Sequence, residues 1–285
     1  IYSTSNSFGY CDMRPLIKII PTLTSCTAPL AFVASTHCFN TLGKLHNTNS
    51  YFTSAPKLKM GWSDTWSDIL AGGNQRWKVT DEEAHKKALS HFQRFVQTDP
   101  SETHVLCPLA GDDPFVYLLF SLGYSVSAID LVPEAVEELR KTFKCSSKED
   151  WSMEESSNTV IWKHSSGRAT FLVGDALQKR PELVGKFDAV YDKDSFGALP
   201  KNLRDGFCSR IAEYTKKGGI IYLECKLKEN HEEVIDVGPP FSLKGENLME
   251  DTSYGANFEY LEELGTVYPL SRPGMNQTGH VMRRK

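Results

Sequence analysis

Short apolar runs alternate with amphipathic stretches through the middle of the chain, a pattern that predicts strands joined by helices. The clearest unit has an apolar run at residues 104–108, an apolar helix at 115–122 and a second apolar run at 125–129. Between the first run and the helix lies a tight turn, and Asp130 stands at the tip of the second run. A strand, a turn, a helix and a second strand ending in an acid is typical of a nucleotide-binding α/β fold.

The same alternation continues toward the C-terminus. Helices are predicted at 80–97, 133–143 and 200–217, and further strands at 169–173, 187–191, 220–225, 258–264 and 279–283. Residues 144–167 form a polar insert without clear periodicity. The fold class that follows is α/β, with a doubly wound, mostly parallel, seven-stranded Rossmann-like sheet and helices on both faces.

Polar residues gather where the predicted strands end. Gly111, Asp130, Asp175 and Asp192 each follow a different strand. Ligands of doubly wound folds bind beyond the carboxyl ends of the strands, so these residues predict one common site. Asp130 lies 19 positions after Gly111, close to the separation of about 20 at which an acid meets a ribose diol.

The charges in the turn at residues 109–113, between the first strand and its helix, indicate which ribose-bearing cofactor is bound. A dinucleotide needs several glycines whose bare amides reach its pyrophosphate. This turn has one glycine, and Asp112 and Asp113 stand where phosphates would lie. S-adenosylmethionine has no phosphate and carries a sulfonium and an ammonium, so it fits better than NAD. The alternative is that both carboxylates only cap the following helix and face water.

Three tryptophans precede this unit. Trp62 and Trp66 share one helical face, and Trp77 follows shortly after. Core packing is the ordinary explanation of this pattern, and the functional alternative is an aromatic lid over the cofactor.

Composition narrows the classes of partner. The chain has 285 residues, 40% of them apolar, and no uninterrupted apolar run long enough to span a membrane. Residues 61–285 contain 27 basic and 35 acidic residues, a net charge of −8, which gives no footprint for nucleic acid. We therefore expect a small-molecule partner, no membrane association and a monomer. The seven cysteines lack metal-binding spacing and are interpreted as reduced thiols of an intracellular protein.

Residues 1–60 differ from the rest of the chain. They contain 15 Ser or Thr, five basic residues and one acid. We interpret them as a mostly disordered targeting presequence or a non-native extension ahead of a domain at 61–285. A transit peptide would direct the protein to a plastid or mitochondrion, whereas translation starting at Met60 would leave it cytoplasmic.

Several stretches together resemble the thiopurine S-methyltransferase family over residues 62–285. They are Trp62-x-x-x-Trp66, Pro108-Leu109-x-Gly111, the segments 162–167 and 185–192, Ala198 to Arg204, and Gly238-Pro239-Pro240-Phe241. The resemblance implies a class I S-adenosylmethionine-dependent methyltransferase. Cofactor-binding residues would be Trp62, Trp66, Leu109, Gly111, Asp130, Asp175 and Ala176. Substrate would meet Trp77, Lys193, Pro239 and Phe241, although residues 237–241 also read as an ordinary proline turn.

The sequence departs from the family pattern at three places. Ala110 and Asp112 replace the cysteine and lysine of the usual PLCGK turn, Trp77 lies farther from Trp66 than expected, and Lys193 replaces an arginine. Lysine keeps the charge of arginine but loses its bidentate fork.

The expected reaction is in-line methyl transfer to the thiolate of a small thiol or thiopurine. Lys193 would hold an anionic acceptor, and Asp192 or Asp194 would orient it or take a proton. Alternatives are methylation of halide or thiocyanate, and a non-catalytic protein that only binds S-adenosylmethionine. A metal-dependent O-methyltransferase using Asp175, Asp192 and Asp194 ranks last, so no metal is expected.

Overall fold

The computed structural model describes residues 61–73, 75, 77–143, 150–156 and 159–285. The predicted presequence at 1–60 lies outside the described residues, so its targeting role stays a prediction. Among the described helices, none is both long and apolar enough to cross a membrane.

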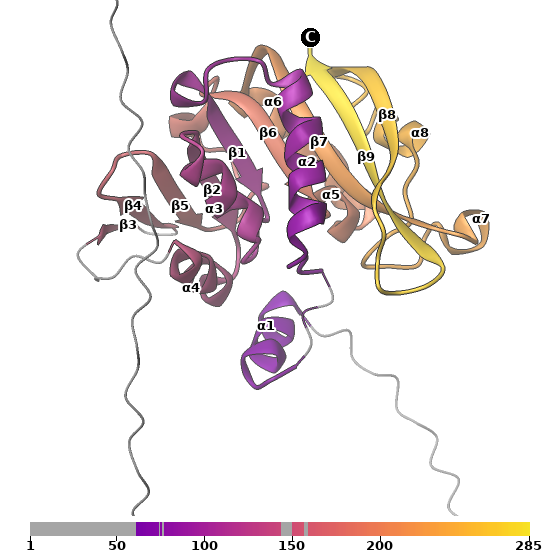
Figure 1. The fold of residues 1–285 in the computed structure, drawn as a ribbon, viewed down its shortest axis with the longest axis horizontal. Helices are drawn as coiled ribbons and strands as arrows, with labels where there is room; N and C mark the ends of the chain where they lie inside the picture. Colours follow the sequence, from indigo (N-terminus) through magenta and orange to yellow (C-terminus); the bar gives the residue numbers. More distant parts are fainter. Residues whose placement is uncertain (1–60, 74, 76, 144–149, 157–158) are drawn as a thin grey trace, which may run out of the picture. The chain divides into compact units, whose positions relative to one another are not determined.

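Within the described part of the chain, nine strands form one sheet in the order β3-β4-β5-β2-β1-β6-β7-β9-β8 (Figure 1). The strands are β1 (His104–Pro108), β2 (Ser125–Asp130), β3 (Trp151–Ser156), β4 (Thr159–His164), β5 (Ala169–Val173), β6 (Phe187–Lys193), β7 (Thr215–Lys228), β8 (Phe258–Tyr268) and β9 (Met275–Arg284).

The sheet is mixed, and the prediction of seven mostly parallel strands was wrong in number and in direction. The five central strands, β5, β2, β1, β6 and β7, pair in parallel. Antiparallel pairing joins β9 to β7, β8 to β9, β4 to β5 and β3 to β4. The two unpredicted strands, β3 and β4, lie in the polar insert. Because β3 is an edge strand with exposed polar positions, the apolar alternation of a half-buried strand is absent there.

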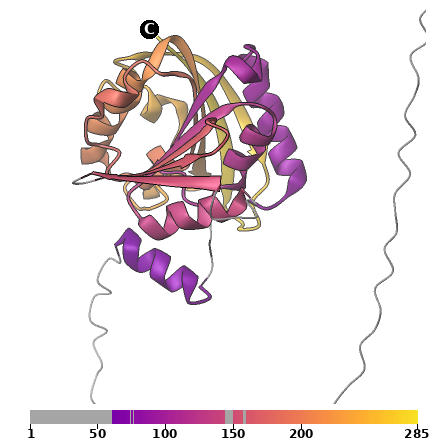
Figure 2. The same cartoon turned by 90° about the vertical axis from the view of Figure 1, so that its left-hand side faces the viewer.

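Helices cover both faces of the sheet, as predicted. They are α1 (Trp62–Leu70), α2 (Glu82–Phe95), α3 (Pro114–Ser121), α4 (Pro133–Thr142), α5 (Ser195–Ala198), α6 (Lys201–Tyr214), α7 (His231–Val234) and α8 (Gly245–Leu248), with short 3-10 turns at Pro100–Glu102 and Pro181–Leu183. Figure 2 shows α2, in purple, and α6, in orange, on opposite sides of the sheet.

Each face has its own apolar core, because alternate residues of a strand point to opposite faces. Phe92 of α2 is fully buried on one face against Phe115, Tyr124 and Tyr222. Phe207 and Ile211 of α6 are buried on the other. The chain order reverses between β1 and β6, and in doubly wound folds this reversal opens the ligand crevice.

Candidate active site

The turn after β1 links the carboxyl ends of β1 and β2. Leu109 and Gly111 have positive φ angles of 42° and 55°. The amide of Gly111 donates to Asp130 Oδ2 at 3.0 Å, and the amide of Val132 donates to Oδ1, also at 3.0 Å. Burial raises the pKa of Asp130, although these backbone hydrogen bonds oppose the rise. The structure thus brings together the glycine and the acid that the sequence spacing paired.

The end of β5 lies beside this pair. The amide of Gly174 donates to the carbonyl of Asp130 at 2.8 Å, and Asp175 Oδ1 accepts the amide of Leu177 at 2.8 Å. Ala176 is buried. The predicted cofactor residues that follow β1, β2 and β5 therefore lie along three adjacent strand ends.

The segment from Trp62 to Trp77, called the tryptophan segment below, contributes rings that pack against the Gly111 turn after β1. The Trp77 ring makes edge contacts with Trp66 and Trp62, at centroid distances of 5.9 and 6.0 Å. A Cβ atom on Gly111 would lie 3.5 Å from the Trp66 ring and 3.7 Å from Trp77 Nε1. Trp66 is buried against Val132, which lies in the loop after β2, whereas Trp62 is 41% exposed. The segment therefore packs as a small core and also covers the turn, so the two sequence explanations are compatible.

The two acids of the turn have different roles. Asp113 caps α3 by accepting the amide of Phe115 at 2.9 Å. Asp112 does not face water: its side chain is 3% exposed and is ion-paired with Lys78. Asp112 Oδ2 also accepts from Gln75, and Oδ1 is buried without a hydrogen-bond partner among the described residues. A pocket of about 730 Å³ adjoins Asp112, Lys78 and Gln75.

At the end of β6, Asp192 and Lys193 point to opposite faces of the sheet. Asp192 is fully buried and accepts the amide of Ser195 at 2.9 Å and the hydroxyl of Tyr254 at 3.0 Å. Burial raises the pKa of Asp192 to about 6. Its carboxylate therefore fixes the start of α5 and lies apart from the contacts of Lys193.

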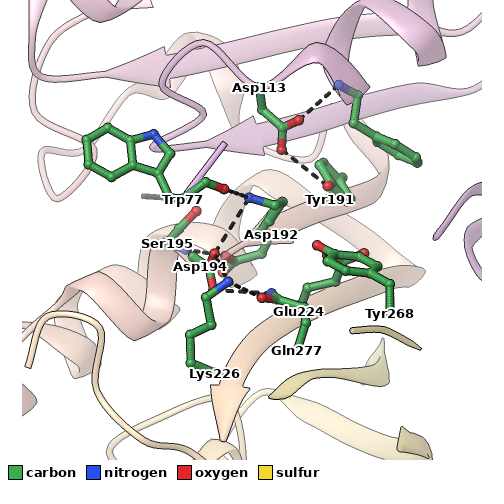
Figure 3. Close-up of polar contacts among 12 residues, drawn as sticks. Trp77, Asp113, Tyr191, Asp192, Asp194, Ser195, Glu224, Lys226, Tyr268 and Gln277 are labelled. Carbon is green, nitrogen blue, oxygen red and sulfur yellow. Dashed lines mark hydrogen bonds and ion pairs between the residues drawn. The ribbon is translucent and has the colours of Figure 1, made fainter. Parts of the chain in front are cut away.

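Figure 3 shows the polar side chains of Asp194, Glu224, Lys226 and Gln277 in the same region as Trp77. Lys193 joins them and Asp113 in one buried polar group. Its Nζ donates to the backbone carbonyl of Trp77 at 2.7 Å and lies 3.6 Å from Asp194 Oδ2. Asp194, at φ 62°, also accepts from Lys226 at 3.0 Å and from Gln277 at 3.2 Å. Burial lowers the pKa of Lys193, but nearby carboxylates outweigh burial and raise the pKa above its usual value. Lys193 is therefore a charged, buried ammonium that is already paired.

Sequence reasoning missed several members of this group. Glu224 on β7 accepts from Tyr222 at 2.7 Å and from Tyr268 of β8. Burial raises the pKa of Glu224 to about 7. A signal was present in the sequence, because Glu224 and Lys226 interrupt the apolar run of residues 220–227 within β7. Gln277 gave no such signal, because it lies between Asn276 and Thr278 in a polar part of β9.

The proline loop lies beside α5. The amide of Phe241 donates to the carbonyl of Gly197 at 2.9 Å, and the Arg204 guanidinium lies 5.2 Å from the Phe241 ring. Pro239 is exposed. These contacts place the loop next to the β6 end, and its role in substrate binding stays a prediction.

Among the described residues, no group of His, Cys, Asp and Glu side chains could hold a metal ion. The nearest partners of Asp175, Asp192 and Asp194 are amides, hydroxyls and lysines.

The reversal between β1 and β6, the acid at the tip of β2 and the strand-end site define a doubly wound α/β fold of the kind that binds ribose-bearing cofactors at its strand ends. A family profile described as thiopurine S-methyltransferase matches residues 60–275. The chain belongs to this family, as its motifs indicated, and is an S-adenosylmethionine-dependent S-methyltransferase.

Curated relatives agree with the family. A thiopurine S-methyltransferase of Legionella pneumophila (strain Corby) is 26% identical over 199 residues, 69% of this chain and 83% of the relative. One of Psychrobacter cryohalolentis is 24% identical over 229 residues, 77% of this chain and 95% of the relative.

Solved structures share the fold. A Burkholderia thailandensis 1,6-didemethyltoxoflavin-N1-methyltransferase with S-adenosylhomocysteine bound has a TM-score of 0.53 at 16% identity, covering 78% of this chain and 87% of that chain. The [4+2]-cyclase SpnF has a TM-score of 0.54 at 14% identity, covering 77% and 91%. A fold shared with a cyclase does not by itself specify methyl transfer, so the reaction rests on the family.

The residues at the strand ends fit the cofactor. Asp130 offers a half-buried carboxylate to a ribose diol, and Gly111 adds no side chain of its own at the turn. The cofactor supplies an electrophilic methyl group on a sulfonium, and these residues would hold its nucleoside.

Proposed function

We propose that this methyltransferase acts on the sulfur of small aromatic or heterocyclic thiols, thiopurines among them, and that the acceptor binds beside Trp77. One observation carries the proposal. The Trp77 side chain lies against Gly111 of the cofactor turn, and its backbone carbonyl accepts from Lys193 at the end of β6. Trp77 thus contacts both the turn after β1, where we place the cofactor, and the buried polar group at the end of β6.

For this reaction the main contribution of the protein is to hold the two reactants in position. The thiol loses its proton, the thiolate sulfur forms a bond to the methyl carbon, and the bond from that carbon to the sulfonium breaks. An aromatic thiol is acidic enough to ionise near neutral pH without a dedicated base. Proximity then provides much of the acceleration.

The tryptophans favour a planar acceptor. The edge-on packing of Trp62, Trp66 and Trp77 leaves Trp62 partly exposed. An aromatic acceptor in contact with such a ring gains about 0.5–1.5 kcal/mol beyond its burial. An inorganic anion gains nothing comparable.

The test is a methyl-transfer assay on the full chain with labelled S-adenosylmethionine and four acceptors: a thiopurine, benzenethiol, thiocyanate and iodide. We expect product from the two organic thiols. Volatile product from thiocyanate or iodide alone would assign the chain to anion methylation. Cofactor binding without any product would support a non-catalytic binding protein.

A matched pair of variants tests the place of the acceptor. Trp77→Ala should lower kcat/KM for benzenethiol by about tenfold or more, equivalent to about 1.4 kcal/mol. Trp162→Ala is the control, because Trp162 lies on β4 against the Arg140 guanidinium, away from these contacts. Equal effects of the two changes would contradict the assignment of Trp77.

A further inference from the structure

We propose that the acceptor carries no negative charge apart from its reacting sulfur, and that Glu224 is the specificity-determining residue that excludes acceptors with a second anionic group. The inference rests on the proposed function, because it takes a thiol bound beside Trp77 as the acceptor.

Among the described residues of the buried polar group, the positive charges do not exceed the negative charges. Its cations are Lys193 and Lys226, and both contact Asp194, at 3.6 and 3.0 Å. Asp113 and Glu224 add two further carboxylates that act on Lys193. The two lysines therefore face three acids, and Lys193, which the sequence suggested as an anion anchor, is already compensated.

Glu224 occupies the position from which it can act on the acceptor side. In the parallel pairing of β6 and β7, Glu224 is the register partner of Lys193, so both side chains lie on the same face. Glu224 is 1% exposed, which keeps its charge in a poorly screened environment. Tyr222 and Tyr268 donate to its carboxylate and hold it in place.

The ionisation of Glu224 sets the charge of the whole group. Its pKa is raised by burial to about 7, while Tyr268, Lys193 and Tyr222 oppose the rise. At pH 8, about one unit higher, the carboxylate is mostly ionised, and the group is then net negative. The charge of a bound thiolate is matched by the sulfonium of the cofactor. A second anionic group on the acceptor meets no unpaired cation among the described residues of the group and is repelled.

Three para-substituted benzenethiols separate charge from shape: 4-methylbenzenethiol, 4-mercaptobenzoate and 4-(trimethylammonio)benzenethiol. All three are largely thiolates at pH 8, so differences in kcat/KM report the second group. With the full chain we expect the neutral thiol to exceed the carboxylate by about tenfold or more, and the cationic thiol to exceed the carboxylate as well.

The variant Glu224→Gln keeps the size of the side chain and its hydrogen-bonding capacity toward the two tyrosines. It should reduce the preference for the neutral thiol over the carboxylate by about tenfold. The control is Glu102→Gln, the same change at an exposed position near the amino end of β1, which should leave the ratio as in the unchanged chain. A merely structural role of Glu224 would alter all three thiols together and leave the ratio unmoved.

Asp113→Asn provides a second variant should Glu224→Gln not fold, because asparagine can still cap α3. It should reduce the ratio in the same direction. Methylation of all thiols with equal or greater preference for 4-mercaptobenzoate would overturn the inference and leave the proposed function standing. Absence of product from every thiol would overturn the proposed function itself.

Discussion

Replacing Asp192 by Asn should remove a pH-dependent loss of stability. The carboxylate is fully buried, and its pKa is raised by burial from 3.8 to about 6. The folded protein therefore binds this proton more tightly than the unfolded chain does. The resulting stabilisation is complete below about pH 3.8 and is lost as the pH rises through about 6.

The size of the effect follows from the two pKa values. Each unit between them corresponds to about 1.4 kcal/mol, so ionisation of Asp192 lowers the free energy of unfolding by about 3 kcal/mol above pH 6. Asparagine cannot ionise. Its oxygen can still accept the amide of Ser195, and its NH₂ group can donate to the Tyr254 oxygen.

Urea denaturation at intervals from about pH 4 to about pH 8 measures this difference. The free energy of unfolding of Asp192→Asn, minus that of the unchanged chain, should rise by about 2.5 kcal/mol over the range, since part of the full effect lies below pH 4. Asp251→Asn is the control, since Asp251 is exposed. A difference for Asp192→Asn that stays constant with pH would refute the reasoning. Methyl transfer should survive this change if Asp192 acts through the start of α5, whereas its loss would favour the catalytic role suggested by the sequence.

Two further changes test the cofactor turn and the core. Gly111→Ala places a Cβ atom at φ 55° and should lower the free energy of unfolding by about 1–2 kcal/mol; isothermal titration should also show weaker binding of S-adenosylmethionine. Phe92→Ala removes a fully buried ring that contacts Phe115, Tyr124 and Tyr222, and urea denaturation should show a loss of about 3–5 kcal/mol. Unchanged stability in either variant would contradict the packing described for it.

Much of the fold was predictable because its signals are local. The five parallel strands each begin within five residues of their predicted starts, since apolar runs and turn residues define them. The proximity of Gly111 and Asp130 was predictable for the same reason, because one strand-turn-helix-strand unit contains both residues, whereas the hydrogen bond between them was not predicted. The edge strand β3 was missed because an exposed strand loses the apolar alternation on which the prediction depended. Its partner β4 was missed because residues 160–162 form an apolar run too short to show a period.

The sequence by itself therefore determined the strand-helix alternation, the pairing of the turn after β1 with the acid at the tip of β2, and the motifs of the family. Only the tertiary structure decided which charges meet. The Lys193 ammonium and the Trp77 carbonyl are 116 positions apart in the chain, and Lys226 and Gln277 reach Asp194 from two further strands. The order of strands in the sheet sets these contacts, and that order depends on long-range packing that local patterns do not encode. The same packing turns Asp192 toward α5 and leaves Lys193 compensated by three acids.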